Sequence, residues 1–218
     1  MIKAVIFDMD GLMLDTERLT VKAWDQIGED LGIGPFGHLV QYLIGRNRAA
    51  NEEFFRQKFN GNPSFETVLE LKEEYFRKYF AEHGIPVKEG LFDLLKWLKE
   101  AGIRTSVATS TEVNTARDEL IQTGILPYFD ELVCGNMVKH GKPAPDIFLL
   151  AAEKLGVSPE NCMVLEDSPS GIRAAHAAGM NPVMVPDLVQ PDEEISAMLT
   201  RKVESLSCVR GVIEELNA

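Results

Sequence analysis

Short apolar runs that alternate with helical patterns constrain the fold of this chain more than any other feature. The runs are rich in β-branched and aromatic residues and occupy positions 2–10, 103–110, 129–135, 162–167 and 181–185. The first of them, IKAVIFDMD, is typical of a strand that is buried on both faces of a parallel sheet. Strands that alternate with helices predict an α/β fold with a doubly wound parallel sheet.

The segments between these runs carry the start and stop signals of helices. Leucines recur on one helical face of residues 90–102, and glycine ends this pattern and the patterns at 111–124, 145–156 and 168–179. Thr111 is a candidate N-cap of the second helix, and Ser168 followed by Pro169 is a typical start of the fourth. We therefore expect a helix after most of the strands.

Residues 16–86 depart from this alternation. They contain no convincing buried strand, and three amphipathic helical patterns are separated by loops rich in glycine and proline. We expect an all-helical domain of residues 16–86, inserted after the first strand. The α/β core domain then consists of residues 1–15 and 87–218.

The charge and the cysteines narrow the function and the location. A net charge of −12, from 22 basic and 34 acidic residues, argues against binding to nucleic acid or to an anionic membrane surface. Three widely spaced cysteines indicate reduced thiols, and no apolar run approaches the length of a membrane span. No signal peptide is visible at the start. We expect a cytoplasmic protein that is a monomer or a weak homodimer.

Polar side chains follow several of the expected strands. In open α/β sheets, ligands bind beyond the carboxyl ends of the strands, so these side chains are expected to converge. The set comprises Asp8 and Asp10 after the first run, Thr109 and Ser110 after the second, Glu166 and Asp167 after the fourth, and Lys142 in a loop before a helix. Neighbouring carboxylates are costly to bury together, so a compensating cation is expected among them.

This set suits phosphoryl transfer. Carboxylate oxygens are ligands for Mg²⁺, which can neutralise the charge of a phosphate. One aspartate can attack phosphorus to give an aspartyl-phosphate, and Asp10 can return to the site once the chain turns at Gly11, as general acid and base. Thr109 and the backbone N–H of Ser110 can donate hydrogen bonds to phosphate oxygens, and Lys142 can pair with nucleophile and phosphate.

Four short segments resemble the motifs of the haloacid dehalogenase-like (HAD) superfamily of phosphotransferases. They are DMDG, VATS, GKPAPD and VLEDSPSG, which occur in the order of the family's motifs. The resemblance implies that Asp8 is the nucleophile and a Mg²⁺ ligand, and that Asp10 is the general acid and base, with its backbone carbonyl on the metal. It also implies that Asp167 is the third protein ligand and that Glu166 assists nearby, often through water.

The longer string DMDGLMLDTE and the helical insert resemble a subgroup that includes β-phosphoglucomutase and several sugar-phosphate phosphatases, in which the insert is a cap over the site. Within the insert, LIGRNR resembles a cap loop that places an arginine, here Arg48 with Arg46 beside it, on the distal phosphate of the substrate. Thr20 and Glu112 stand where β-phosphoglucomutase has a histidine and a lysine. These two departures favour the phosphatase.

The sequence therefore predicts a Mg²⁺-dependent phosphatase that hydrolyses a small phosphorylated metabolite, a sugar or nucleoside monophosphate, through an aspartyl-phosphate. A hexose-phosphate mutase is the alternative, and the choice depends on how well the closed cap excludes water. A phospho-accepting receiver domain is disfavoured by the order of its acidic residues and by the inserted cap. An inactive scaffold is disfavoured because every motif retains its chemical groups.

Overall fold

A single parallel sheet organises the computed structural model, which describes residues 1–44 and 48–218. Within these residues the strand order is β3-β2-β1-β4-β5-β6, and every neighbouring pair is parallel. The strands are β1 (Ala4–Phe7), β2 (Arg104–Thr109), β3 (Glu131–Cys134), β4 (Cys162–Glu166), β5 (Asn181–Met184) and β6 (Arg201–Lys202). The doubly wound α/β fold predicted from the sequence is confirmed.

Strand β1 lies inside the sheet, between β2 and β4. All four of its residues are buried, as the apolar run predicts, and Phe7 at its end is paired with Val107 of β2 and Leu165 of β4. The carboxyl ends of the three strands therefore stand side by side. Edge strand β6 was not predicted, because its two residues are exposed and basic and carry no apolar signal.

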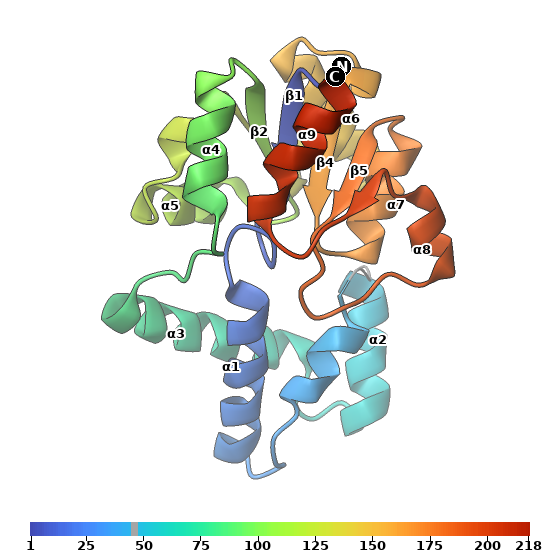
Figure 1. Ribbon diagram of the computed structural model, residues 1–218. Helices are drawn as coiled ribbons and strands as arrows, with labels where there is room; N and C mark the ends of the chain where they lie inside the picture. Colours follow the sequence, from blue (N-terminus) through green and yellow to red (C-terminus); the bar gives the residue numbers. More distant parts are fainter. Residues whose placement is uncertain (45–47) are drawn as a thin grey trace.

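Helices cover both faces of the sheet (Figure 1). Side chains alternate along β1, so Val5 and Phe7 join one hydrophobic cluster while Ala4 and Ile6 join the other. The first cluster includes α4 (Leu91–Glu100), α5 (Val113–Gln122) and α9 (Val209–Asn217), and the second includes α6 (Asp146–Leu155) and α7 (Pro169–Ala177). Helix α8 (Glu193–Met198) packs beside α7, and the short 3-10 helices are η1 (Gly37–Tyr42), η2 (Leu126–Tyr128), η3 (Gly135–Met137), η4 (Pro159–Asn161) and η5 (Leu206–Cys208).

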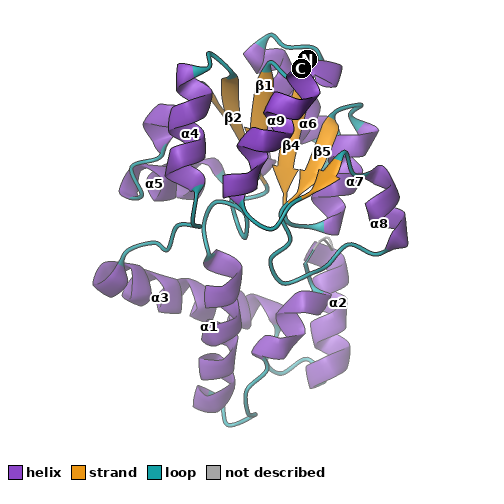
Figure 2. Cartoon of the chain, viewed as in Figure 1, coloured by secondary structure: helices purple, strands orange, loops and turns teal. Residues whose placement is uncertain are grey.

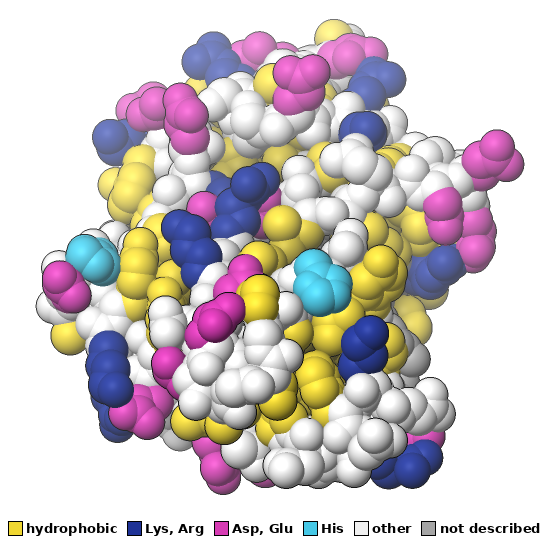
Figure 3. Space-filling model, turned by 90° about the horizontal axis from the view of Figure 1, so that it is seen from below, with side chains coloured by type: hydrophobic (Ala, Val, Ile, Leu, Met, Phe, Trp, Pro, Cys, Tyr) yellow, Lys and Arg dark blue, Asp and Glu magenta, His cyan; other side chains and the backbone are white. Residues whose placement is uncertain are grey.

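The chain between β1 and α4 is helical and lies below the carboxyl edge of the sheet (Figure 2). It contains α1 (Thr16–Asp30), α2 (Arg48–Phe59) and α3 (Phe65–His83), which match the three helical patterns of the sequence. A separate hydrophobic cluster holds these helices, with the Phe55 ring centroid 5.3 Å from that of Trp24 and 5.0 Å from that of Phe65. The outer face of these helices mixes hydrophobic, acidic and basic side chains (Figure 3).

Two adjacent segments connect the helical part to the sheet. Leu14 pairs with Val87 in antiparallel orientation, and the N–H of Asp15 donates to the carbonyl oxygen of Pro86 at 2.9 Å. The Lys88 ammonium lies 2.7 Å from Asp15 Oδ1, which ties the two segments together by charge. Among the described residues, no helix combines the length and the apolar character that a membrane crossing requires.

Candidate active site

The polar residues predicted from the sequence meet in one cavity of about 230 Å³ at the carboxyl ends of β1, β2 and β4. The cavity lies between the sheet and the helical part. Of its lining residues, those predicted from the sequence are Asp8, Asp10, Thr109, Ser110, Lys142, Glu166 and Asp167. Parallel register brings these groups together, although they come from distant parts of the chain.

A buried lysine joins two of the carboxylates. Lys142 Nζ lies 2.5 Å from Asp8 Oδ1 and 2.6 Å from Glu166 Oε1, and it also donates to the carbonyl oxygen of Ala108 at 3.1 Å. All three ammonium hydrogens thus have an acceptor. Because the Lys142 side chain is only 6% exposed, water screens these contacts little. The lysine therefore holds Asp8 in a defined orientation at the end of β1.

The second Glu166 oxygen is held by the start of α7. Oε2 accepts from the N–H groups of Asp167 and Ser168 at 3.1 and 3.0 Å, and from the Ser168 hydroxyl at 2.9 Å. The predicted N-cap is confirmed, since the Ser168 side chain also accepts from the N–H of Gly171. The helix lies so close that a Cβ at position 171 would stand 1.8 Å from Glu166 Oε1. The glycine of SPSG thus leaves room for the Glu166 carboxylate.

Three carboxylates form a candidate metal centre. Ligand oxygens of Asp8, Glu166 and Asp167 all lie within 4.8 Å of one another, and all three residues are buried. Burial raises the pKa of Asp8 to about 7; the positive charge of Lys142 acts against this rise, and the negative charge of Glu166 adds to it. Burial also raises the pKa of Asp167 well above its usual range. Several carboxylate oxygens are thus clustered without enough positive charge nearby to balance them. Such a site suits a hard divalent cation such as Mg²⁺.

A further acid near this centre, Glu17, was not among the residues predicted from the sequence. It lies in the first turn of α1 and lines the same cavity, and its Oε2 is buried without a hydrogen-bond partner. Burial, together with the negative charges of Asp187 and Asp10, raises the pKa of Glu17 to about 8. Its position within DMDGLMLDTE was the available signal, but a glutamate in a first helical turn usually needs no explanation beyond the helix dipole.

Asp10 returns to the site through a turn at Gly11, as expected. Gly11 has a φ of 84°, and a Cβ there would lie 2.3 Å from Asp167 Oδ2, so both conformation and space call for glycine. Asp10 Oδ1 accepts from the Thr16 hydroxyl and Oδ2 from the Thr111 hydroxyl, each at 2.8 Å. The side chain of Asp10 is therefore engaged with two threonines and lies outside the cluster of three carboxylates.

The expected helix start at Thr111 was wrong. The N-cap of α5 is Glu112, whose side chain accepts from the N–H of Asn114 at 2.9 Å. Thr111 instead lies before the helix, with its N–H donating to Thr109 Oγ1 at 3.0 Å. Its hydroxyl is thereby left to bind Asp10.

The cavity continues into the helical part as a second space of about 230 Å³, which shares Asp10, Glu17 and Ile44 with the first. Polar groups of the helices line it. Trp24 Nε1 and Asn51 Oδ1 are buried there without hydrogen-bond partners, and Lys72 Nζ lies 5.0 Å from the centroid of the Phe76 ring. Together with Glu17 Oε2, these described groups offer a donor, two acceptors and a cation to a ligand held at the carboxylates.

The remaining sequence predictions fall outside or away from this geometry. Arg46 lies outside the described residues, and Arg48 is the first residue of α2 but its side chain is not among the described ones. Thr20 lines the second space, where its hydroxyl donates to the backbone carbonyl of Thr16 at 2.9 Å.

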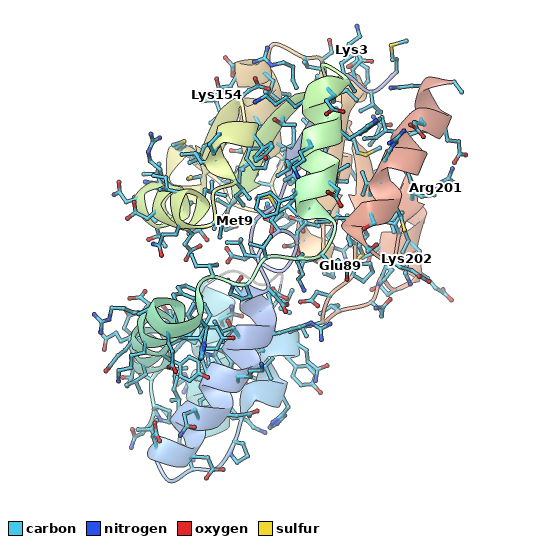
Figure 4. All side chains as sticks on the ribbon, turned by 60° about the vertical axis from the view of Figure 1, so that its left-hand side comes forward. Lys3, Met9, Glu89, Lys154, Arg201 and Lys202 are labelled. Carbon is cyan, nitrogen blue, oxygen red and sulfur yellow. The ribbon has the colours of Figure 1, made fainter. Side chains whose placement is uncertain are left out.

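A larger cavity, of about 720 Å³, lies at the opposite edge of the sheet near Lys3 (Figure 4). None of the predicted site residues lines it. Chemistry, and not size, therefore identifies the candidate active site.

Comparisons with known proteins give a consistent result. A family model described as haloacid dehalogenase-like hydrolase matches residues 2–179. The chain is 34% identical over 178 residues to the phosphorylated carbohydrates phosphatase of Thermotoga maritima, and the match covers 82% of each chain. It is 36% identical over 194 residues to the fructose-1-phosphate phosphatase YqaB of Escherichia coli, and this match covers 83% of this chain and 95% of the other. The crystal structure of β-phosphoglucomutase from Clostridium difficile superposes with a TM-score of 0.75 at 27% identity, covering 100% of this chain and 98% of the other.

Proposed function

The chain belongs to the haloacid dehalogenase-like hydrolase family, and we propose that it is a Mg²⁺-dependent phosphatase of small phosphorylated sugars or related metabolites. The observation that carries the proposal is the contact of 2.5 Å between Asp8 and the buried Lys142, at the head of a cavity lined by acids. A carboxylate that is oriented in this way can act as a nucleophile toward phosphorus.

In the proposed mechanism, an Asp8 oxygen attacks the phosphorus while the bond from phosphorus to the substrate oxygen breaks. Asp10 donates a proton to the departing oxygen and later takes one from the water that hydrolyses the aspartyl-phosphate. Lys142 stabilises the Asp8 carboxylate before attack and the phosphate charge afterwards. Thr109 Oγ1 accepts a backbone hydrogen bond, which leaves its own hydrogen for a phosphate oxygen, and the N–H of Ser110 is a second donor.

Asp8 and Asp167 are the side chains that we expect to hold Mg²⁺, together with the backbone carbonyl of Asp10 that the family resemblance implies. Glu166 already accepts from Lys142 and Ser168, so we assign it a supporting place beside the metal. When bound, Mg²⁺ would neutralise negative charge on the transferring phosphoryl group.

Residues 16–86 are proposed to form a cap domain over a core domain of residues 1–15 and 87–218. Their separate hydrophobic cluster and their two adjacent connections to the sheet support this division. Unpartnered groups on Trp24, Asn51 and Glu17 suit the hydroxyls of a sugar, which both donate and accept hydrogen bonds. The named substrates of the two phosphatase relatives agree with a phosphorylated carbohydrate.

A hexose-phosphate mutase is the second candidate, because the chain also superposes on a β-phosphoglucomutase. In that reaction the substrate, and not water, would take the phosphoryl group from Asp8. The resemblance suggests Arg48, with Arg46 as its neighbour, as the ligand of a second phosphate. Thr20 stands where β-phosphoglucomutase has a histidine, and its hydroxyl binds the backbone of its own helix, so this position gives no support to the mutase.

The test measures phosphate release from a panel of sugar, polyol and nucleoside monophosphates, in Mg²⁺ and in EDTA. Conversion of β-glucose 1-phosphate to glucose 6-phosphate is followed in parallel. We expect Mg²⁺-dependent phosphate release that Asp8→Asn abolishes while the variant remains folded. Isomerisation without phosphate release would identify a mutase, and near-normal turnover by Asp8→Asn would refute the nucleophile.

A further inference from the structure

Asp10 is held from two sides by residues of different parts of the molecule. Thr16 is the first residue of α1 in the helical part, whereas Thr111 follows β2 and belongs to the sheet side. Both hydroxyls donate to the Asp10 carboxylate at 2.8 Å, one to each oxygen. Each oxygen therefore has its own partner, and rotation about both side-chain torsions of Asp10, χ1 and χ2, is restrained.

The backbone of Thr111 is itself fixed to Thr109, which lines the same cavity as Asp8. Its N–H donates to Thr109 Oγ1 at 3.0 Å, and Thr109 is only 1% exposed at the end of β2. Its carbonyl oxygen accepts from the N–H of Gly135 at 3.4 Å. Since Glu112 supplies the cap of α5, the Thr111 hydroxyl has no capping role to perform. Its hydrogen bond to Asp10 is thus the contact that the local geometry leaves for it.

We propose that Thr111 is a positioning residue that aims the Asp10 carboxyl group at the leaving oxygen. The inference rests on the proposed function, because it assigns a task within the same acid–base step. A hydroxyl both donates and accepts, so Thr111 can stay bonded to Asp10 when that group is a carboxylate and when it carries a proton. Valine has nearly the same shape and can do neither.

The two threonines would respond differently to a shift of the helical part relative to the sheet. Thr16 would move with α1, and Asp10 Oδ1 would then be free to meet the substrate. Thr111 would stay with β2, which carries Thr109 beside the nucleophile. Oδ2 would therefore remain held throughout, which would leave Oδ1 as the oxygen that exchanges the proton.

The leaving group provides a readout that a merely structural role would not move. A sugar alkoxide must be protonated as it leaves, whereas p-nitrophenolate leaves without a proton. The value of kcat/KM covers only the steps up to loss of the leaving group, so the later attack of water does not enter. We expect Thr111→Val to lower kcat/KM about tenfold or more for a sugar phosphate and only slightly for p-nitrophenyl phosphate.

Matched variants complete the experiment. Thr111→Ser should restore the sugar-phosphate rate, and Thr115→Val, which alters an exposed threonine of α5, should leave both rates unchanged. Adding Thr111→Val to Asp10→Asn should have no further effect, because the group that it positions is already lost. Thr111→Ala repeats the measurement with a smaller side chain if the valine variant unfolds.

The inference is overturned if the Thr111 variants slow both substrates equally, or if their effect adds fully to that of Asp10→Asn. Loss of turnover in Asp8→Asn with no effect at Thr111 would refute the positioning role alone. Normal turnover in Asp8→Asn would refute the proposed function itself.

Discussion

Gly171 offers the sharpest test of how the acidic centre is built. It is the third residue of α7, and its φ is not positive, so alanine introduces no backbone strain there. The new Cβ would stand 1.8 and 2.4 Å from the two Glu166 oxygens and 1.9 Å from the carboxyl carbon that carries them. These atoms cannot overlap, so Gly171→Ala must displace either the Glu166 carboxylate or the start of the helix.

The cost follows from the contacts of Glu166. Its side chain is 1% exposed and accepts hydrogen bonds from Lys142 at one oxygen and from three groups of Asp167 and Ser168 at the other. Losing two hydrogen bonds to a buried charge costs about 3–6 kcal/mol, at about 1.5–3 kcal/mol each. Replacing glycine in a helix returns at most about 1 kcal/mol. We therefore expect a net destabilisation of about 2–5 kcal/mol.

Urea unfolding in EDTA measures this change without interference from bound metal. Gly211→Ala in α9 is the matched control, because a Cβ there has nothing within 4 Å and should stabilise the protein by up to about 1 kcal/mol. Activity of Gly171→Ala in Mg²⁺ should also fall, since Lys142 loses one of its two anionic partners. If Gly171→Ala is as stable as Gly211→Ala, the placement of the Glu166 carboxylate against α7 is refuted.

Three further predictions concern charge. Lys142→Met should lower kcat by about 10²–10³-fold, the usual loss for one preorganised donor. The same variant should destabilise the protein in EDTA by about 3–5 kcal/mol, because two buried carboxylates lose their partner. Unfolding in EDTA like that of the wild type would contradict the expected destabilisation. Without metal, stability should fall as pH rises from about 4 to 7, since burial raises the pKa of Asp8 from 3.8 to about 7 and the folded state binds more protons over this range. The gain in Tm from Mg²⁺ should therefore be larger at pH 8 than at pH 5. Equal gains at the two pH values would contradict the assignment of Asp8 to the metal. Burial likewise raises the pKa of Glu119 from 4.5 to about 7, so Glu119→Gln should stabilise the protein at pH 8 by about 1 kcal/mol, a figure reduced for the partial exposure of Glu119, and by less at pH 5. The control is Asp118→Asn on the exposed side of α5. An equal response of the two variants would contradict the prediction.

The sheet and the convergence of the acids at its carboxyl edge could be predicted because each depends on a short stretch of sequence. The run before Asp8 is apolar at every strand position, so a buried central strand was the only stable environment for it. The residues at strand ends then had to meet, because parallel strands in register share one edge. Asp8, Glu166 and Asp167 were therefore predictable as neighbours although more than a hundred and fifty residues separate the first from the other two.

The contacts of Asp10 and Glu17 could not be predicted in the same way. Thr111 and Glu112 both suit a helix start, and only the packed structure shows that Glu112 caps α5 and that Thr111 binds Asp10. The position of Glu17 depends on the angle at which α1 leaves the turn at Gly11, which no local pattern encodes. Interactions of this kind arise from tertiary packing between the helical part and the sheet.

The pairing of Leu14 with Val87 has a consequence for protein engineering. Directly opposed residues of antiparallel strands lie about 4.5–5.5 Å apart, a gap that a two-residue hairpin turn bridges. The ends of the inserted segment therefore already stand as the two sides of a hairpin. An Asn-Gly turn can therefore replace the inserted segment between Leu14 and Val87, and the same junction can accept a different insert in place of the present one.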